Sequence, residues 1–208
     1  LAQTLERKQH MSWNPQQYSR FAGQRLRPAL DLIARIPAEH PESVVDLGCG
    51  TGNVTRILRS RWPHARIVGV DGSPQMLAEA RKGNVDIAWE QSELRSWKPV
   101  EKFDLVFSNA ALHWLDNHPA LFARLAGCIA PGGVLAVQMP CNFGAPSHTL
   151  MHELASSPPW RDALARLLRP APVLEPAAYY RLLAPCARTL DIWETEYLQV
   201  LEGENPVA

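Results

Sequence analysis

A strand-like segment that runs into three closely spaced glycines is the part of this sequence best suited to holding a ligand. Residues 45–52 read Val-Asp-Leu-Gly-Cys-Gly-Thr-Gly, and an apolar stripe in residues 54–58 predicts a helix directly after them. Glycines permit positive φ angles and let a ligand approach the backbone, and the free N–H groups of the following helix point into the same turn. The spacing therefore predicts a ligand cradle at Gly48, Gly50 and Gly52.

Two acidic residues beside the cradle narrow the kind of ligand. Asp71 stands 19 residues after Gly52, at the end of an apolar segment, where a carboxylate can accept both hydrogen bonds of a ribose diol. A dinucleotide motif would need glycine where Asn53 stands, and Asp46 would repel a diphosphate. Asp46 suits a ligand with a cationic part, and S-adenosylmethionine carries an ammonium, a sulfonium and a ribose. We therefore expect S-adenosylmethionine as the cofactor.

Several segments carry a resemblance to a known family. VVDLGCGTGN, VGVDGSPQML and FDLVFSNAALHW resemble successive motifs of the class I S-adenosylmethionine-dependent methyltransferases. MSWNPQQYSRFAGQRLRPALDLIARIP and LAVQMPCNFGAPSHTLMHELA resemble more specifically the trans-aconitate 2-methyltransferase family, and the likeness runs from Met11 to the C-terminus. It implies methyl transfer to a carboxylate of trans-aconitate, which gives its monomethyl ester. Members of that family continue beyond this C-terminus, so we expect the chain to be truncated.

The resemblance also implies which residues hold the cofactor. It places Met76 on the adenine, Glu93 near the adenine amino group where the family usually has Asp, and Asn109 at the methionine ammonium. Met76 could equally be a core residue, and Glu93 a solvated turn carboxylate. The expected cofactor-binding residues are Asp46, Gly48, Gly50, Gly52, Asp71, Ser73, Met76, Glu93, Asn109 and Tyr18.

The acceptor side is expected at the end of the strand-like segment 103–108. Ligands bind at the carboxyl ends of strands in doubly wound sheets, so Asn109, His113 and Trp114 are the expected catalytic residues. A packed His113 and a simply buried Trp114 remain alternatives, and any single arginine could form a surface ion pair instead. The expected acceptor-binding residues are Arg25, Arg27, His148, Trp160, Tyr180 and Arg181. No metal site is expected, because His148 and His152 lack a third ligand.

The chemistry expected here needs no proton transfer. A carboxylate is ionised near pH 7, so its attack on a sulfonium methyl requires positioning rather than a general base. A phenol or carbon acceptor would need a base and would make His113 indispensable. Three readings therefore remain open: an enzyme acting on trans-aconitate, a methyltransferase with another small acceptor, and a cofactor-binding module without catalysis.

Alternating strands and helices must position these residues. Hydrophobic patterns and caps predict helices over 14–22, 28–36 and 117–129 and a helix after Ser73, with a short helix after the glycines. They predict strands over 43–47, 65–70, 85–89, 103–108 and 134–139, with a turn at Pro131-Gly132-Gly133, and a late strand over 189–201. This order indicates a Rossmann-like, doubly wound and mostly parallel α/β sheet.

Two regions flank this sheet in the expected organisation. The resemblance implies that the N-terminal helices form a lid over the cofactor. Residues 140–188 are expected to form a helical cap with helices near 147–155, 160–168 and 177–184. Residues 1–10 are an extension or a frayed segment before a methyltransferase domain at 11–208.

Composition supports one ordinary domain. The chain has 208 residues, with 21 Lys plus Arg against 21 Asp plus Glu, and a neutral balance weighs against a nucleic-acid binder. No apolar run approaches the roughly 18 residues that a membrane span needs. The four cysteines are scattered, which predicts free thiols in a reducing cytoplasm. A small-molecule carboxylate acceptor is the expected partner, and the sequence leaves the oligomeric state open.

Overall fold

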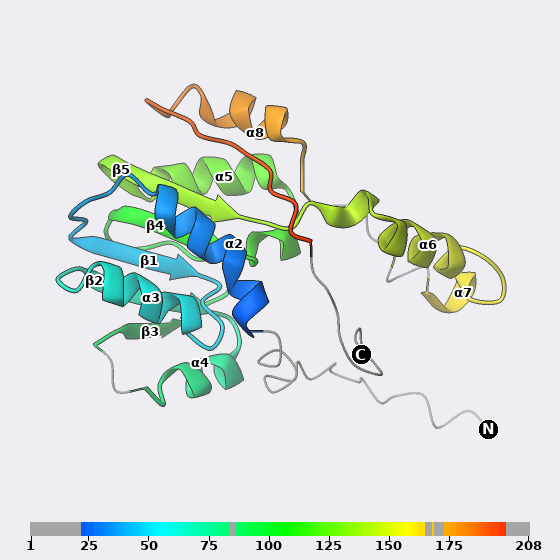
Figure 1. Cartoon of the computed structure of the whole chain (residues 1–208), viewed down its shortest axis with the longest axis horizontal. Coiled ribbons are helices and arrows are strands. Elements are labelled where there is room, and N and C mark those ends of the chain that lie inside the picture. The colour runs from blue at the N-terminus through cyan, green and yellow to red at the C-terminus, as the bar shows by residue number, and fades with distance from the viewer. Residues whose placement is uncertain (1–21, 84–85, 165–167, 169–172, 199–208) are drawn as a thin grey trace.

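The sheet contains five parallel strands. The structure, a computed structural model, describes residues 22–83, 86–164, 168 and 173–198. Strand order is β3-β2-β1-β4-β5, and every neighbouring pair is parallel, which confirms the predicted sheet (Figure 1). The strands are β1 (Ser43–Leu47), β2 (Arg66–Asp71), β3 (Ala88–Gln91), β4 (Phe103–Asn109) and β5 (Ile129–Gln138).

Helices cover both faces because the strands alternate their apolar side chains. On one face, Val44, Ile67 and Phe107 pack against α2 (Ala22–Arg35) and α3 (Asn53–Arg61). On the other face, Val45 and Val106 pack against α5 (His118–Gly127) and α8 (Pro176–Leu183). The helix α4 (Pro74–Ala80) lies beside β2 and β3. Each face therefore buries one continuous apolar cluster.

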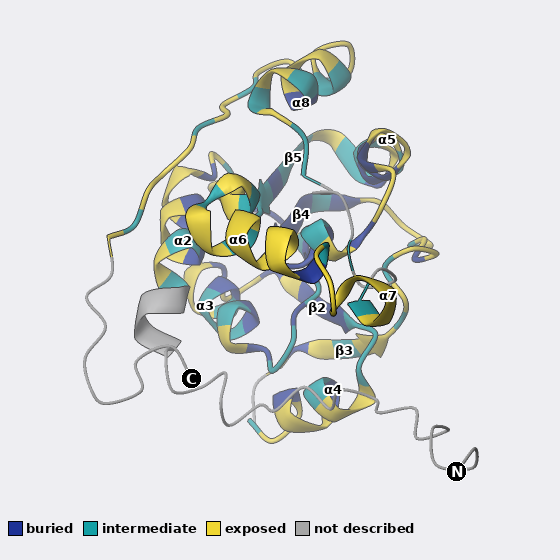
Figure 2. Cartoon of the chain, turned by 90° about the vertical axis from the view of Figure 1, so that its right-hand side faces the viewer, coloured by how far each residue is buried: buried dark blue, intermediate teal, exposed yellow. Residues whose placement is uncertain are grey.

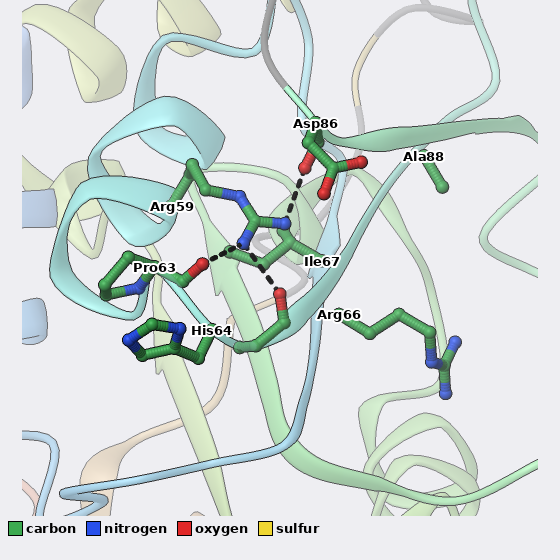
Figure 3. Close-up of a pocket in the computed structure, with 8 residues that line it drawn as sticks. Arg59, Pro63, His64, Arg66, Ile67, Asp86 and Ala88 are labelled. Carbon is green, nitrogen blue, oxygen red and sulfur yellow. Dashed lines mark hydrogen bonds between the residues drawn. The ribbon is translucent and has the colours of Figure 1, made fainter.

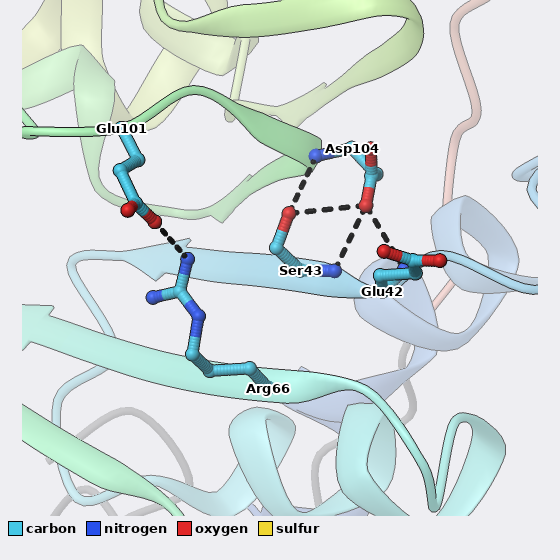
Figure 4. Close-up of polar contacts among 5 residues, drawn as sticks. All are labelled: Glu42, Ser43, Arg66, Glu101 and Asp104. Carbon is cyan, nitrogen blue, oxygen red and sulfur yellow. Dashed lines mark hydrogen bonds and ion pairs between the residues drawn. The ribbon is translucent and has the colours of Figure 1, made fainter.

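Polar groups bind one another where the strands begin, at the amino edge of the sheet. Asp104 Oδ2 accepts hydrogen bonds from the backbone N–H groups of Glu42 and Ser43, each at 2.9 Å, and from Ser43 Oγ at 3.0 Å (Figure 4). Ser43 Oγ accepts in turn from the Asp104 N–H at 3.0 Å. Arg66 and Glu101 add an exposed ion pair at 3.4 Å. The polar groups of this edge therefore pair with one another, whereas at the carboxyl edge, where the strands end, polar groups lack partners in the described structure.

The helix predicted to start near Pro28 begins earlier. α2 spans Ala22–Arg35 with Pro28 inside it, so the prediction was wrong at its start, although the end before Pro37 was confirmed. An internal proline removes one backbone hydrogen bond. Burial of the face that contains Leu32 and Ile33 offsets that loss. The helix predicted over 14–22 lies, except for Ala22, outside the described residues.

Two strands differ from their predicted bounds. The expected turn at residues 131–133 lies inside β5, because Ile129 already pairs with Phe103 before the register shifts and Val134 pairs with Leu105. Gly132 has a φ of 81°, which lets the chain bulge there. β3 runs from Ala88 to Gln91 rather than over 85–89, since its pairing follows β2 out to Asp71.

The predicted late strand does not form in the described residues. Residues 189–198 carry no strand and follow α2 through side-chain contacts. Tyr197 donates a 2.5 Å hydrogen bond to Asp31, and Arg35 pairs with Asp191 at 3.7 Å. Polar side-chain contacts therefore hold this segment on a helix instead of pairing it with a strand.

The helices after β5 occupy two places. η2 (Asn142–Gly144), α6 (Pro146–Ala155) and α7 (Arg161–Leu164) follow β5, and Figure 2 shows α6 in front of the carboxyl edge with mostly exposed residues. α8 instead packs beside α5 through Tyr179. No helix in the described part of the chain is both long and apolar enough to cross a bilayer.

Candidate functional site

The three glycines of the turn adopt left-handed backbone conformations that residues with side chains rarely take. Gly48, Gly50 and Gly52 have φ angles of 76°, 54° and 76°. The N–H groups of Gly48 and Cys49 donate to the Val70 carbonyl at 2.8 and 3.0 Å, which ties the loop to the end of β2. A Cβ on Gly48 would lie 2.2 Å from that of Ala111. The loop is thus a tight turn between β1 and α3, closely packed against its neighbours.

Asp71 is anchored at the cradle by both carboxylate oxygens. Oδ2 accepts from the Gly50 N–H and Oδ1 from the Ser73 N–H, each at 2.8 Å. A carboxylate has about four lone-pair positions, so two remain for a ligand at this half-buried side chain. Asp71 therefore holds the loop and still offers acceptors to hydroxyl groups.

Asp46 lies behind the loop rather than at its surface. Its side chain is buried, and its Oδ2 accepts a 2.6 Å hydrogen bond from Thr55 Oγ1 on α3. Burial raises the pKa of Asp46 to about 7, while the Thr55 hydrogen bond lowers it and the charge of Asp71 raises it. A nearby cation would favour the ionised form of this carboxyl.

Cys49 is buried near the carboxylates of Asp46 and Asp71. Its thiol is buried, and a Cβ on Gly69 would lie 3.1 Å from its Sγ. Burial first, and then the negative charges of Asp46 and Asp71, raise the pKa of the thiol well above its ordinary range. Cys49 is consequently a protonated packing residue.

The end of β4 leaves two buried polar atoms without a partner in the described structure. These are Asn109 Oδ1 and His113 Nδ1. Between them, Ala110 has a φ of 50°, a left-handed conformation that costs about 1–2 kcal/mol for a residue with a Cβ. Unpaired buried polar atoms and backbone strain gather at binding sites. The two atoms therefore mark the end of β4 as a candidate ligand site.

His113 is neutral in this setting. It belongs to η1 (Leu112–Trp114), and burial, with a smaller contribution from nearby His118, lowers its pKa. The ring of Trp114 lies 4.8 Å from that of His113 and is 69% exposed. The alternative of a buried Trp114 is therefore wrong, and its face is open to a ligand.

Ser73, Met76 and Glu93 surround Asp71. Ser73 caps α4 by accepting from the Met76 N–H at 3.3 Å, which confirms the predicted cap, and Met76 is half-buried. Glu93 is exposed, with Oε1 3.0 Å from the position of a Cβ on Gly72. The structure thus brings these predicted residues to one corner of the cradle.

Trp89 is a residue of the site that the sequence reasoning missed. A Cβ on Gly52 or Gly69 would lie 2.4 or 2.5 Å from its indole ring, so both glycines make room for it. Trp89 is the register partner of Gly69 on the neighbouring strand. A large aromatic residue opposite a strand glycine was the available signal.

The expected acceptor-binding residues are dispersed. Tyr18 lies outside the described residues, as does the side chain of Arg25, while Arg27 stacks on Tyr197 with 4.8 Å from its guanidinium carbon to the ring centroid. His148 is half-buried on α6, and Trp160 is 56% exposed before α7. Exposed Tyr180 and Arg181 lie on α8, beside α5 rather than with α6 and α7 (Figure 1). The structure does not gather these residues around one ligand.

A shallow pocket of about 330 Å³ opens at the opposite edge, where β2 begins. Arg59 from α3 occupies it and donates to the carbonyls of Pro63, Ala65 and Asp86 (Figure 3). The guanidinium is therefore committed to backbone acceptors. The hydrogen bonds of Arg59 connect α3 to the residues that precede β2 and β3, and the pocket lies away from the cradle.

The sequence of the chain is similar to those of known methyltransferases. A family of methyltransferase domains matches residues 18–190. A trans-aconitate 2-methyltransferase of Azoarcus sp. (strain BH72) is 48% identical over 196 residues, which cover 94% of this chain and 77% of the relative.

Solved structures share the fold. An amino pentose methyltransferase of Micromonospora echinaspora, solved with S-adenosylmethionine bound, has a TM-score of 0.52 at 26% identity and covers 62% of this chain and 57% of its own. A chain of the Haloferax volcanii complex that contains the Trm112 methyltransferase activator has a TM-score of 0.61 at 22% identity, over 83% of this chain and 72% of that chain. The second likeness shows the methyltransferase fold alone.

Proposed function

We propose that this chain, which belongs to the trans-aconitate 2-methyltransferase family of S-adenosylmethionine-dependent methyltransferases, converts trans-aconitate into its monomethyl ester. The observation that carries the proposal is the 48% identity to such an enzyme over 94% of the chain, which includes the cradle, the end of β4 and the segment after β5. The geometry of the carboxyl edge is consistent with this chemistry.

The residues at the cradle fit the cofactor. The loop of left-handed glycines leaves room for a backbone contact, Asp71 offers free lone pairs for the ribose hydroxyls, and Asn109 Oδ1 is a buried acceptor that an ammonium would satisfy. We assign Glu93 to the adenine amino group and Met76 to the adenine face. The chemistry that the bound cofactor supplies is an electrophilic methyl group on a sulfonium.

The task of the chain is then to bring an anionic oxygen to that methyl group. A carboxylic acid with a pKa of about 4 is ionised near neutrality, so no side chain has to remove a proton. His113 is uncharged, because burial lowers its pKa, and can donate one hydrogen bond without fixing the acceptor as a strong ion pair would. Trp114 offers an exposed aromatic face beside the same place.

We assign the covering of this site to two parts of the chain. α6 and α7 form the portion of the 140–188 cap that faces the carboxyl edge, with His148 and Trp160 as its acceptor-binding candidates (Figure 2). α8 fixes the return of that cap to α5, with Tyr180 and Arg181 on its exposed side. Tyr18, Arg25 and Arg27 belong to the N-terminal lid in this proposal.

A two-stage experiment tests the function. Calorimetry with S-adenosylhomocysteine measures cofactor binding, and methyl transfer is then assayed on trans-aconitate, cis-aconitate, citrate and a set of phenols, with the product identified by mass spectrometry. We expect binding, and ester formation with a higher kcat/KM for trans-aconitate than for the others. Binding with preferred transfer to a phenol would establish another acceptor, and binding without transfer would establish a cofactor-binding module.

A further inference from the structure

A buried histidine outside the predicted site touches the turn that carries His113 and Trp114. His118 is the first residue of α5 and only 1% exposed. Its Nε2 lies 3.1 Å from the Leu112 carbonyl, and its Nδ1 lies 2.5 Å from the Tyr179 hydroxyl on α8. Leu112 is the first residue of η1.

With a neutral His118 ring, the partners allow only one set of hydrogen-bond directions. A carbonyl can only accept, so the proton of a neutral His118 ring resides on Nε2. Nδ1 is then an acceptor, and the Tyr179 hydroxyl must donate to it. The Tyr179 oxygen accepts in turn from the Leu174 N–H at 3.1 Å. The chain of bonds from Leu174 to Leu112 has one consistent polarity.

This hydrogen-bond chain supports a turn that needs support. Ala110 enters it with a φ of 50°, and local hydrogen bonds close it, from the Trp114 N–H to Ala111 and from the Leu115 N–H to Leu112. His118 adds a tertiary hydrogen bond to the Leu112 carbonyl. The rings of His118, Phe122 and Tyr179 pack with centroids 4.9–5.9 Å apart, so the imidazole has little freedom to turn.

We propose that His118, oriented by Tyr179, is a positioning residue that sets η1 and thereby places His113 and Trp114 against the methyl acceptor. The inference rests on the proposed function, because η1 is the acceptor side of that site. The hydrogen bonds from the N–H groups of Gly48, Cys49 and Gly50 go to Val70 and Asp71 and do not involve His118. Loss of the hydrogen-bond chain should therefore impair acceptor positioning and spare cofactor binding.

Two variants and a matched control test this. Tyr179→Phe keeps the ring and deletes the hydroxyl, whereas His118→Gln retains an amide donor for the Leu112 carbonyl. Trp62→Phe deletes a part-buried hydrogen bond of a buried side chain, from Trp62 Nε1 to the Ala38 carbonyl at 3.1 Å, at the far end of α3. It controls for a general loss of stability.

The kinetic test looks for a split between acceptor turnover, which should fall, and cofactor binding, which should stay unchanged. In Tyr179→Phe we expect kcat/KM for trans-aconitate to fall roughly tenfold to a hundredfold, the scale of a displaced reacting group. The Kd for S-adenosylhomocysteine should stay within about twofold. His118→Gln should retain more activity than Tyr179→Phe, and Trp62→Phe should lose melting temperature without the split. Equal losses in binding and turnover, or no kinetic effect beyond that of Trp62→Phe, would overturn the inference.

A second readout needs no acceptor. Nuclear magnetic resonance of ¹⁵N-labelled wild-type protein should show a proton on His118 Nε2, the atom that faces the Leu112 carbonyl. In Tyr179→Phe, the backbone amides of His113 and Trp114 should shift while those of Gly50 and Asp71 stay in place. A His118 ring that carries its proton only on Nδ1, or unmoved His113 and Trp114 amides, would contradict the proposal. Inactivity of the wild type on trans-aconitate would instead refute the function and leave these spectra to decide on His118.

Discussion

The carboxyl of Asp46 and the hydroxyl of Thr55 share a 2.6 Å hydrogen bond that joins β1 to the first turn of α3. Both side chains are buried, with 2% and 0% exposed. The bond braces the two elements that enclose the glycine loop. It also keeps a titratable group inside the molecule, next to the expected cofactor, and that has a measurable consequence for stability.

Asp46→Asn should remove a pH dependence from folding. The pKa of Asp46 is raised from 3.8 to about 7 in the folded protein, so its contribution is fully present below pH 3.8 and is lost as the pH rises through about 7. Relative to Asp46→Asn, the wild type should lose roughly 1.4 kcal/mol of unfolding free energy per pH unit between these limits. Urea denaturation at several pH values measures this. A difference between the two proteins that stays constant with pH would contradict the raised pKa.

Thr55→Val provides the matched comparison for Asp46. Removal of the hydroxyl takes away the hydrogen bond that lowers the pKa of Asp46. The decline in stability should then continue to a higher pH than in the wild type. The same denaturation series checks it, and an unchanged upper limit would show that Thr55 does not act on this carboxyl.

Asp71→Ala should weaken binding of S-adenosylhomocysteine at least tenfold, about 1.4 kcal/mol. The carboxylate accepts from Gly50 and Ser73 and keeps lone pairs for the ribose, so its loss removes both the loop anchor and the acceptor. Asp86→Ala, an exposed carboxylate beyond α4, is the control and should bind normally. Calorimetry decides, and unchanged affinity in Asp71→Ala would remove the ribose assignment.

Gly48→Ala should damage the cradle through two separable effects. The φ of 76° costs about 1–2 kcal/mol with any side chain, and the new Cβ would lie 2.2 Å from that of Ala111. Gly132→Ala shares a positive φ of 81° without a close neighbour and should show the backbone cost alone. Adding Ala111→Gly to Gly48→Ala should restore part of the stability. Thermal unfolding measures both, and equal losses in Gly48→Ala and Gly132→Ala would exclude the steric clash.

His113→Phe should reduce turnover of trans-aconitate by about tenfold, less than the roughly 10²–10⁴-fold that a general base contributes. The acceptor is already ionised and His113 is neutral, because burial lowers its pKa. The wild-type kcat should accordingly be level from about pH 7 to 9. Steady-state kinetics across that range is the check. A larger loss, with a wild-type rate that rises with pH, would indicate base catalysis and a different acceptor.

The sequence reveals the cradle because its constraints are local. Gly48, Gly50 and Gly52 require positive φ angles, and Ser73 followed by proline begins a helix whatever surrounds it. The parallel sheet follows from the alternation of elements, which is also a property of neighbouring residues.

What the sequence hides depends on tertiary contacts. The alternation in residues 189–198 indicates a strand, but Tyr197 and Asp191 bind side chains of α2 instead. Proline at 28 and the Pro-Gly-Gly of β5 carry turn propensity that packing and strand pairing override. Trp89 and His118 take their roles from neighbours far along the chain, Gly52 and Tyr179, and no local spacing announces such pairs.

The reactivity of the buried Cys49 thiol can report how often the cradle opens. Alkylation requires a thiolate in contact with reagent, and Cys49 is enclosed with a raised pKa, whereas Cys141 and Cys186 lie on the surface. Iodoacetamide should therefore consume the two surface thiols first and the buried thiols of Cys49 and Cys128 later, and it should reach Cys49 only through excursions of the loop. Saturation with S-adenosylhomocysteine should slow the alkylation of Cys49. The rate of that reaction then measures how often the site opens.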